Sequence, residues 1–100
     1  MPDSNTQNST GKHPLVSVVM CTYNGERFLH PQIGSVLSQT YPHLELIIVD
    51  DASSDNTVSI LEEYSRKDSR VKYFVNEKNL GYNKNFEKAM LLANGDYIAP

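Results

Sequence analysis

The stretch LELIIVDD, residues 44–51, decides the fold that we predict for this chain. It is a near-continuous apolar run that stops abruptly at two carboxylates. VSVVMC at residues 16–21 is a similar run, and it stops at TYNG, residues 22–25. Such runs, separated by a helical pattern, are typical of neighbouring parallel strands that are buried on both faces. Ligands of open parallel sheets bind outside the carboxyl ends of the strands, so we expect Tyr23 and the acidic pair to share one edge.

The rest of the chain continues this alternation of strands and helices. Residues 1–14 are rich in Ser, Thr and Asn without apolar periodicity, which predicts a disordered leader. Apolar spacing and turn residues predict strands at 15–21, 44–49, 71–75 and from 96, and helices at 26–38, 58–67 and 82–93. We expect an α/β fold with a mainly parallel, doubly wound, Rossmann-like sheet in the order 3-2-1-4 and helices on both faces, and right-handed crossovers between parallel strands support it.

Local signals predict how the helices begin and end. Pro31 is tolerated only near the start of a helix, so the regular part of the first helix is expected to begin near His30. The polar cluster at residues 53–56 predicts a turn and a cap for the second helix. In the third helix, Phe86, Ala89, Met90 and Ala93 are expected to face inward, and Gly95 is expected to be a left-handed cap.

Composition narrows the class of protein. The chain has 100 residues, which is enough for one domain. Its net charge is −3, and its Lys and Arg residues are interleaved with acidic residues. This pattern argues against a nucleic-acid partner. A single cysteine, Cys21, fits a reducing compartment, and the sequence has neither an apolar run of about 18 residues nor a secretory signal. We therefore expect a cytoplasmic protein without a transmembrane segment, with a role at the inner face of the membrane left open.

Several chemistries lack their motifs. The first strand is followed by no Gly-x-Gly-x-x-Gly, no Gly-Lys-Ser/Thr phosphate loop occurs, and the histidines do not show metal-ligand spacing. An aromatic ring and a carboxylate at one sheet edge suit a nucleobase instead, through stacking and acceptance of an N–H from a pyrimidine. Only one of the two adjacent carboxylates can face the base. The alternative interpretation is a surface tyrosine beside an acidic turn and helix cap.

Several motifs in register resemble one family. These are residues 16–25, QTYP at 39–42 leading into residues 45–57, which end in DDASSDNT, the triplet NLG at 79–81 and GDYI at 95–98. Together they resemble the N-terminal part of family 2 glycosyltransferases, which have the GT-A fold of nucleotide-diphospho-sugar transferases. The resemblance covers essentially everything after residue 15. The triplet KNF at 84–86 is reminiscent of members that make bacterial surface polysaccharides, rhamnosyltransferases among them.

The resemblance implies roles for the residues that match the family's motifs. Tyr23, with its neighbours Thr22 and Asn24, would flank the nucleobase, and Asp51 would bind it, with uracil or thymine as the expected base. Glu26 would help to order the nucleotide pocket. Lys84, the remaining candidate, either approaches a phosphate or is a solvated helix lysine.

The resemblance also implies what this chain lacks. The family's metal-binding Asp motif follows the segment at 95–98 by a few residues, and this chain ends at Pro100. We therefore expect residues 15–100 to be the nucleotide-binding part of a GT-A domain, truncated before that motif. No catalytic residue and no metal ligand is assigned in this chain, and a divalent metal (Mg or Mn) is expected only for a longer enzyme.

The function predicted from these observations is that of an N-terminal fragment of a glycosyltransferase. It would bind a UDP- or dTDP-sugar donor for transfer to a glycan or lipid-linked acceptor in bacterial cell-surface polysaccharide synthesis. Alone, the chain is expected to be inactive. The alternatives are a non-catalytic nucleotide-binding fragment or pseudoenzyme, and a receiver-type signalling domain. Receivers place their acidic pair after the first strand, whereas here it follows the second.

Overall fold

A single parallel sheet forms the centre of the molecule. The computed structural model describes residues 14–99, so the predicted leader, except for residue 14, lies outside the described part. The sheet has four strands in the order β3-β2-β1-β4, which confirms the predicted α/β class and strand order. Its strands are β1 (Val16–Thr22), β2 (Leu44–Asp50), β3 (Val71–Val75) and β4 (Tyr97–Ala99), and the helices are α1 (Glu26–Leu37), α2 (Thr57–Lys67) and α3 (Tyr82–Leu92).

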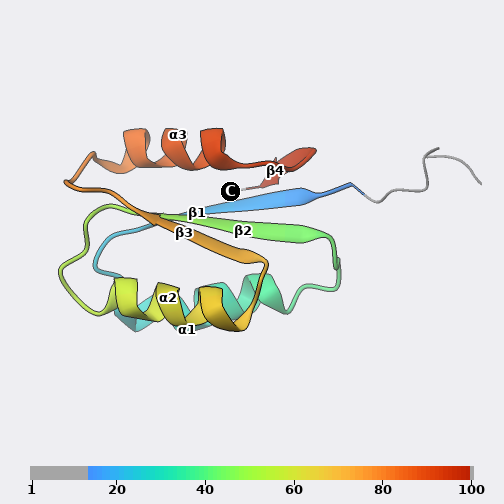
Figure 1. Ribbon diagram of the computed structural model, residues 1–100, viewed down its shortest axis with the longest axis horizontal. Coiled ribbons are helices and arrows are strands. Elements are labelled where there is room, and N and C mark those ends of the chain that lie inside the picture. Colours follow the sequence, from blue (N-terminus) through green and yellow to red (C-terminus); the bar gives the residue numbers. More distant parts are fainter. Residues whose placement is uncertain (1–13, 100) are drawn as a thin grey trace, which may run out of the picture.

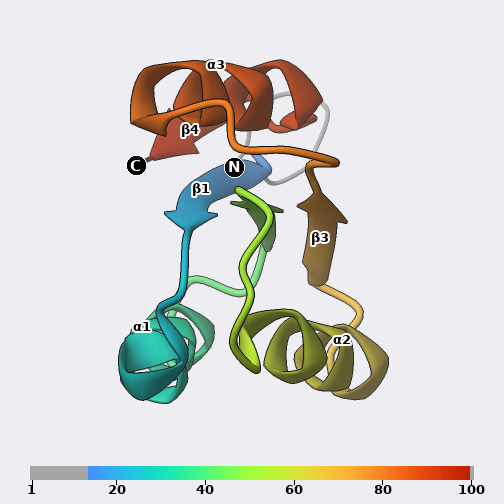
Figure 2. The same ribbon diagram turned by 90° about the vertical axis from the view of Figure 1, so that its left-hand side faces the viewer.

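The helices cover both faces of the sheet. Figures 1 and 2 show α1 and α2 below the sheet and α3 above it. Successive strand residues point to opposite faces, so the apolar run of β2 supplies two cores and every one of its residues is buried. The α1–α2 side contains Val18, Leu29, Ile33, Leu46, Ile48, Leu61 and Val71, and the α3 side contains Val19, Ile47, Val49 and Ala89.

The strand register aligns the carboxyl ends of three strands. Thr22 of β1 pairs with Asp50 of β2, and Asp50 in turn pairs with Val75 of β3. The ladder continues for one more bond on each side, because the Asp51 amide donates to the carbonyl of Thr22 and the Asn76 amide to that of Asp50, both at 2.9 Å. The loops that follow these strands therefore emerge side by side, at the left-hand end of Figure 1.

Two acidic residues satisfy the first amides of α1 and α2. Asp55 accepts hydrogen bonds from the backbone amides of Thr57 (2.9 Å) and Glu26 (3.3 Å), and Glu26 accepts one from the amide of Asn56 (3.2 Å). Each helix thus receives a carboxylate from the other helix's N-terminal segment, where the helix dipole is positive. The predicted polar cluster at residues 53–56 supplies an acceptor for the start of α2 through Asp55, whereas the N-cap residue Asn56 makes no side-chain cap bond.

The start of α1 differs from the prediction. The helix is regular from Glu26, and Pro31 lies inside it instead of near its start. Proline lacks the amide that would bond the carbonyl of Arg27, four residues earlier. Both residues are exposed, so water can satisfy that carbonyl and the helix continues.

The end of α3 also differs from the prediction. The chain leaves the helix through Ala93 in an extended conformation (φ −71°, ψ 137°), and Gly81 is the only described glycine with a positive φ. Gly95 is required for close packing instead: a Cβ there would lie 2.5 Å from Ser17 Oγ and 2.7 Å from the Leu15 carbonyl. Met90, expected to face inward, is 42% exposed.

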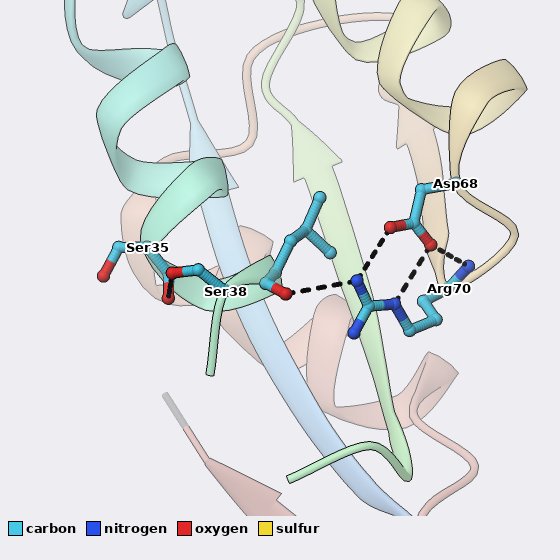
Figure 3. Close-up of polar contacts among 5 residues, drawn as sticks. Ser35, Ser38, Asp68 and Arg70 are labelled. Carbon is cyan, nitrogen blue, oxygen red and sulfur yellow. Dashed lines mark hydrogen bonds and ion pairs between the residues drawn. The ribbon is translucent and has the colours of Figure 1, made fainter. Parts of the chain in front are cut away.

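An arginine connects the opposite end of α1 to the turn before β3. The Arg70 guanidinium donates to both carboxylate oxygens of Asp68, at 2.8 and 3.1 Å, and to the Leu37 carbonyl at 3.2 Å (Figure 3). Hydrogen bonds from this guanidinium lower the pKa of Asp68, although burial opposes them. These bonds hold the turn that leads into β3 against the end of α1.

Candidate functional site

A pocket of about 410 Å³ opens at the carboxyl edge of the sheet. The end of β1, the residue after β2 and the segment leading into α3 all contribute to its wall. The lining residues are Cys21, Thr22, Tyr23, Asp51, Asn79, Gly81, Tyr82 and Asn85. The structure therefore brings Tyr23 and Asp51 to one pocket, as expected from the strand ends.

Asp51 is the charged group in the wall of this pocket. Its Oδ1 accepts hydrogen bonds from the Leu80 amide (2.7 Å) and from Asn76 Nδ2 (3.0 Å), and its Oδ2 accepts one from the Gly81 amide (3.1 Å). The bond from Leu80 is the strongest influence on this carboxyl, and with those from Asn76 and Gly81 it lowers the pKa of Asp51 despite burial. Asp51 is therefore an anion at neutral pH.

The Asp51 carboxylate keeps capacity for a ligand. A carboxylate oxygen can accept about two hydrogen bonds. Among the described residues Oδ1 has two donors and Oδ2 has one. Asp51 can thus accept one further N–H or O–H from a molecule in the pocket, whereas a ligand that offers a lone pair there would be repelled.

Asp50 has a different task from its neighbour. It is fully buried and accepts hydrogen bonds from Thr22 Oγ1 (2.7 Å), Ser53 Oγ (2.6 Å) and the Ser53 amide (2.8 Å). Ala52 then takes a left-handed conformation (φ 63°), which turns the chain toward α2. Asp50 joins the end of β1 to this turn, and only Asp51 reaches the pocket.

Two tyrosines supply aromatic surface at the pocket. Tyr23 follows β1 and is 56% exposed, and Tyr82, at the first turn of α3, is 73% exposed. The Tyr82 ring stacks on Phe86 with 6.1 Å between centroids and 15° between planes. The sequence analysis selected Tyr23 and missed Tyr82. Tyr82 directly follows the NLG triplet, and this position could have indicated it.

Three predicted site residues do not line this pocket. Asn24 turns toward α2: its Oδ1 accepts hydrogen bonds from the amides of Ser54 (2.8 Å) and Asp55 (3.3 Å). Glu26 faces the same segment through its bond to Asn56. Lys84 is exposed on α3 and makes no hydrogen bond or ion pair within residues 14–99. Thr22 does line the pocket, but its hydroxyl is bonded to Asp50.

Asparagines around Asp51 were missed by sequence reasoning. Asn76 and Asn85 are only 5% and 2% exposed, and their side chains are hydrogen-bonded to each other at 2.7 Å. The Asn79 side chain donates to the backbone carbonyl of Asp51. The sequence could have indicated that Asn85 is buried, because it lies four residues before Ala89 and so on the same inward face of α3.

Cys21 is the thiol in the pocket wall. Burial raises its pKa, a hydrogen bond with Asn85 opposes this, and the nearby Asp51 charge raises it further. The thiol is therefore neutral at physiological pH.

The described residues offer no set of metal ligands. Within residues 14–99, no three His, Cys, Asp or Glu side chains gather closely enough to hold a metal ion. A divalent ion does not fit the groups present here, and no chemical step is assigned to one. In the same part of the chain, no helix has the length and apolar character needed to cross a membrane.

Comparison with known proteins identifies the family. The model of glycosyl transferase family 2 matches residues 17–100, and the chain belongs to this family. It is 41% identical over 90 residues to TuaG of Bacillus subtilis, named as a candidate teichuronic acid biosynthesis glycosyltransferase. It is 44% identical over 85 residues to WfgD of Escherichia coli, a UDP-Glc:alpha-D-GlcNAc-diphosphoundecaprenol beta-1,3-glucosyltransferase. These alignments cover 90% and 85% of the chain but only 36% and 33% of those relatives.

Solved structures share the fold. S. aureus TarS (residues 1–349) in complex with UDP is 32% identical, with a TM-score of 0.77 over 84% of this chain and 25% of that one. A mannosyltransferase from Pyrobaculum calidifontis in complex with GDP-Man and Mn²⁺ gives a TM-score of 0.78 at 24% identity, over 88% of this chain and 27% of that one. The observed sheet is thus the Rossmann-like part of a GT-A fold.

Proposed function

We propose that this chain is the donor-binding part of a glycosyltransferase whose donor carries a uracil or thymine base. The ionised carboxylate of Asp51, which can accept one more hydrogen bond, lies in a pocket beside two tyrosines and supports this proposal above all. Uracil and thymine both present an N–H on their pairing edge, and a carboxylate acceptor suits it. The UDP complex of TarS, which is similar over most of this chain, is a second support.

In this proposal the base lies in the pocket with its edge toward Asp51. A tyrosine ring from either side, Tyr23 or Tyr82, can stack on a base face, which contributes about 1–3 kcal/mol. The hydrogen bond to the charged Asp51 contributes about 1.5–3 kcal/mol. Asn24 and Glu26 then do not contact the base; they hold the loop after β1 against the segment before α2. Lys84 would need to swing toward the donor's phosphates.

The reaction proposed for the longer enzyme is transfer of a sugar from a nucleoside diphosphate. The bond between the anomeric carbon and the diphosphate oxygen breaks, and a bond to an acceptor hydroxyl oxygen forms. A base must take the hydroxyl proton, and the leaving diphosphate needs neutralising charge. We assign neither group within residues 14–99. The Mn²⁺ in the mannosyltransferase complex supports a divalent ion, Mg²⁺ or Mn²⁺, held by ligands elsewhere.

We further propose that the acceptor is a glycan, free or lipid-linked, in bacterial surface polysaccharide synthesis. The name of TuaG refers to teichuronic acid biosynthesis, and that of WfgD to a diphosphoundecaprenol-linked acceptor. Such an acceptor would place the reaction at the cytoplasmic face of the membrane. Addition of radiolabelled sugar to a lipid-linked acceptor by membranes containing the longer protein tests this part.

Calorimetric titration of the chain with UDP, dTDP, GDP and ADP tests the base. We expect UDP or dTDP to bind most tightly. Asp51→Ala should weaken that binding about 10- to 100-fold, which corresponds to loss of a hydrogen bond to a charged group. Guanine also carries ring N–H groups, so GDP is the discriminating competitor. Tighter binding of GDP, or equal binding by wild type and Asp51→Ala, contradicts the proposal.

A further inference from the structure

Asn76 lies at the centre of a buried hydrogen-bond network behind Asp51. Its Nδ2 donates to Asp51 Oδ1 (3.0 Å) and to Asn85 Oδ1 (2.7 Å), and its Oδ1 accepts from Lys88 Nζ (2.7 Å). Asn85 in turn donates to the Val49 carbonyl at 2.9 Å. Both amide hydrogens and the amide oxygen of Asn76 are therefore in use.

The charges at the two ends of this network fix the orientation of the Asn76 amide. An ammonium can only donate hydrogen bonds, and an ionised carboxylate can only accept them. Lys88 therefore requires the oxygen of Asn76, and Asp51 requires its nitrogen. The opposite orientation would lose both bonds and place like groups face to face. Lys88 is half-buried, and its bond to Asn76 is its only one within residues 14–99.

A lysine in this position strengthens the bond that Asn76 gives to Asp51. Hydrogen bonds in a chain polarise one another, so an ammonium on the amide oxygen makes the amide N–H a better donor. The effect is larger in a buried network than in water, and Asn76 is only 5% exposed. Asp51 has backbone donors on both oxygens, but Asn76 is its only side-chain donor among the described residues.

We propose that Lys88 and Asn76 form a positioning relay, which aims the Asp51 carboxylate at the N–H edge of the base and so determines selectivity for that edge. The inference rests on the proposed function. Lys88 lines no part of the pocket and touches no donor in this arrangement; it acts through Asn76. Its role is distinct from that expected for Lys84, one turn earlier on α3.

Two measurements on the whole chain test the relay. The first is titration of the Asp51 side-chain carboxyl carbon by NMR without ligand. The second is the ratio of affinities for UDP and for 3-methyl-UDP, which lacks the N–H of uracil. In Lys88→Met, we expect the proton-binding constant of Asp51 to rise about threefold, less than a directly contacting charge produces. We expect the affinity ratio to fall at least threefold toward one.

The design separates this role from general stability. Asp51 stays ionised at neutral pH in every variant, so a changed ratio there reports the position of the carboxylate and not its charge. Lys88→Arg, which keeps a donor, should restore much of both values. Lys78→Met removes a charge from the loop that contains Asn76 without breaking a hydrogen bond, and should change neither value. Cys21, Tyr23 and Tyr82 line the same pocket, and of the other titratable groups Asp50 precedes Asp51 and Glu77 follows Asn76 in the chain. The assigned side-chain carbon resonance of Asp51 distinguishes it from all of them.

The outcomes distinguish the relay from the proposed function. If wild type binds no pyrimidine nucleotide, the proposed function fails, while the ligand-free titration still tests the link between Lys88 and Asp51. If UDP binds but Lys88→Met leaves both the Asp51 titration and the affinity ratio unchanged, the relay is wrong and the function stands. A change of the same size in Lys78→Met also overturns the relay, because the effect would then be one of net charge.

Discussion

At the scale of single residues, two adjacent carboxylates have different surroundings. Asp50 and Asp51 follow each other in sequence, yet the first is surrounded by protein donors and the second retains capacity for a ligand. Alternation along an extended strand separates their directions, and the left-handed Ala52 ends the strand directly after them. The same chemical group therefore holds the loops together in one position and faces the pocket in the next.

We predict that Asp50→Asn destabilises the fold by about 2 kcal/mol, within the range of about 1–3 kcal/mol for an unsatisfied buried group. Asp50 now accepts three hydrogen bonds, one from Thr22 and two from Ser53. The NH₂ group of an asparagine would face at least one of these donors and could not accept its bond. Urea denaturation measures the change in the free energy of unfolding. Thr22→Val, which removes one donor and leaves both from Ser53, should cost less. A cost for Asp50→Asn below that of Thr22→Val would contradict this account.

At the scale of elements, the pocket depends on where helices begin. The N-termini of α1 and α2 lie at the same sheet edge as the pocket, but Asp55 and Glu26 already occupy their first amides. The segment before α3 differs, because its Leu80 and Gly81 amides point to Asp51. These two amides, which immediately precede the helix, help to lower the pKa of Asp51 and so keep it ionised.

The hydrogen bonds that Asp55 accepts at the starts of α1 and α2 lead to a prediction about the pH dependence of stability. A hydrogen bond from the Thr57 side chain is the largest cause that lowers the pKa of Asp55 below its ordinary value of 3.8, and the Thr57 and Glu26 amides add to it. A carboxyl with a depressed folded pKa stabilises the fold fully above its unfolded pKa, and this stability is lost as the pH falls through the folded pKa. Asp55→Asn resembles the protonated state. We expect it to unfold at lower urea than wild type at pH 7, with the difference shrinking below pH 3.8.

Glu63→Gln serves as the control for that experiment. Glu63 pairs with Lys67 at 3.2 Å on the exposed face of α2, and both side chains are half or more exposed. Such surface pairs contribute little, so its removal should leave the pH profile nearly unchanged. A wild-type advantage over Asp55→Asn that persists undiminished at pH 2.5 would show that the cap does not act through its charge.

At the scale of the whole molecule, the sequence predicted the sheet better than the pocket. Apolar runs such as that of β2 indicate buried parallel strands whatever their neighbours, and the observed strand order agrees with right-handed crossovers between them. The pocket depends on side-chain directions in loops. The left-handed Asn24 (φ 49°) directs its side chain to α2, and no pattern of residues indicated that. Buried Asn76 and Asn85 resemble ordinary loop and helix residues until the network around them is seen.

The pocket joins segments that are far apart in the chain, so ligand binding should stabilise the fold as a unit. Its wall combines the end of β1, Asp51 after β2 and the start of α3. A ligand that binds only the folded state adds about 2.7 kcal/mol at a hundredfold excess over its dissociation constant. For a domain of this size, that predicts a rise in the midpoint of thermal unfolding of about 10–20 °C.

Differential scanning fluorimetry with UDP in increasing concentration measures that rise. Asp51→Ala should reduce it in proportion to its weaker binding, because the linkage depends on the ratio of ligand concentration to dissociation constant. Uridine, which has the base without the diphosphate, separates base contacts from phosphate contacts: a rise with uridine that Asp51→Ala removes places the base at Asp51. If UDP stabilises wild type and Asp51→Ala by equal amounts at every concentration, the nucleotide binds elsewhere and the pocket is not the donor site.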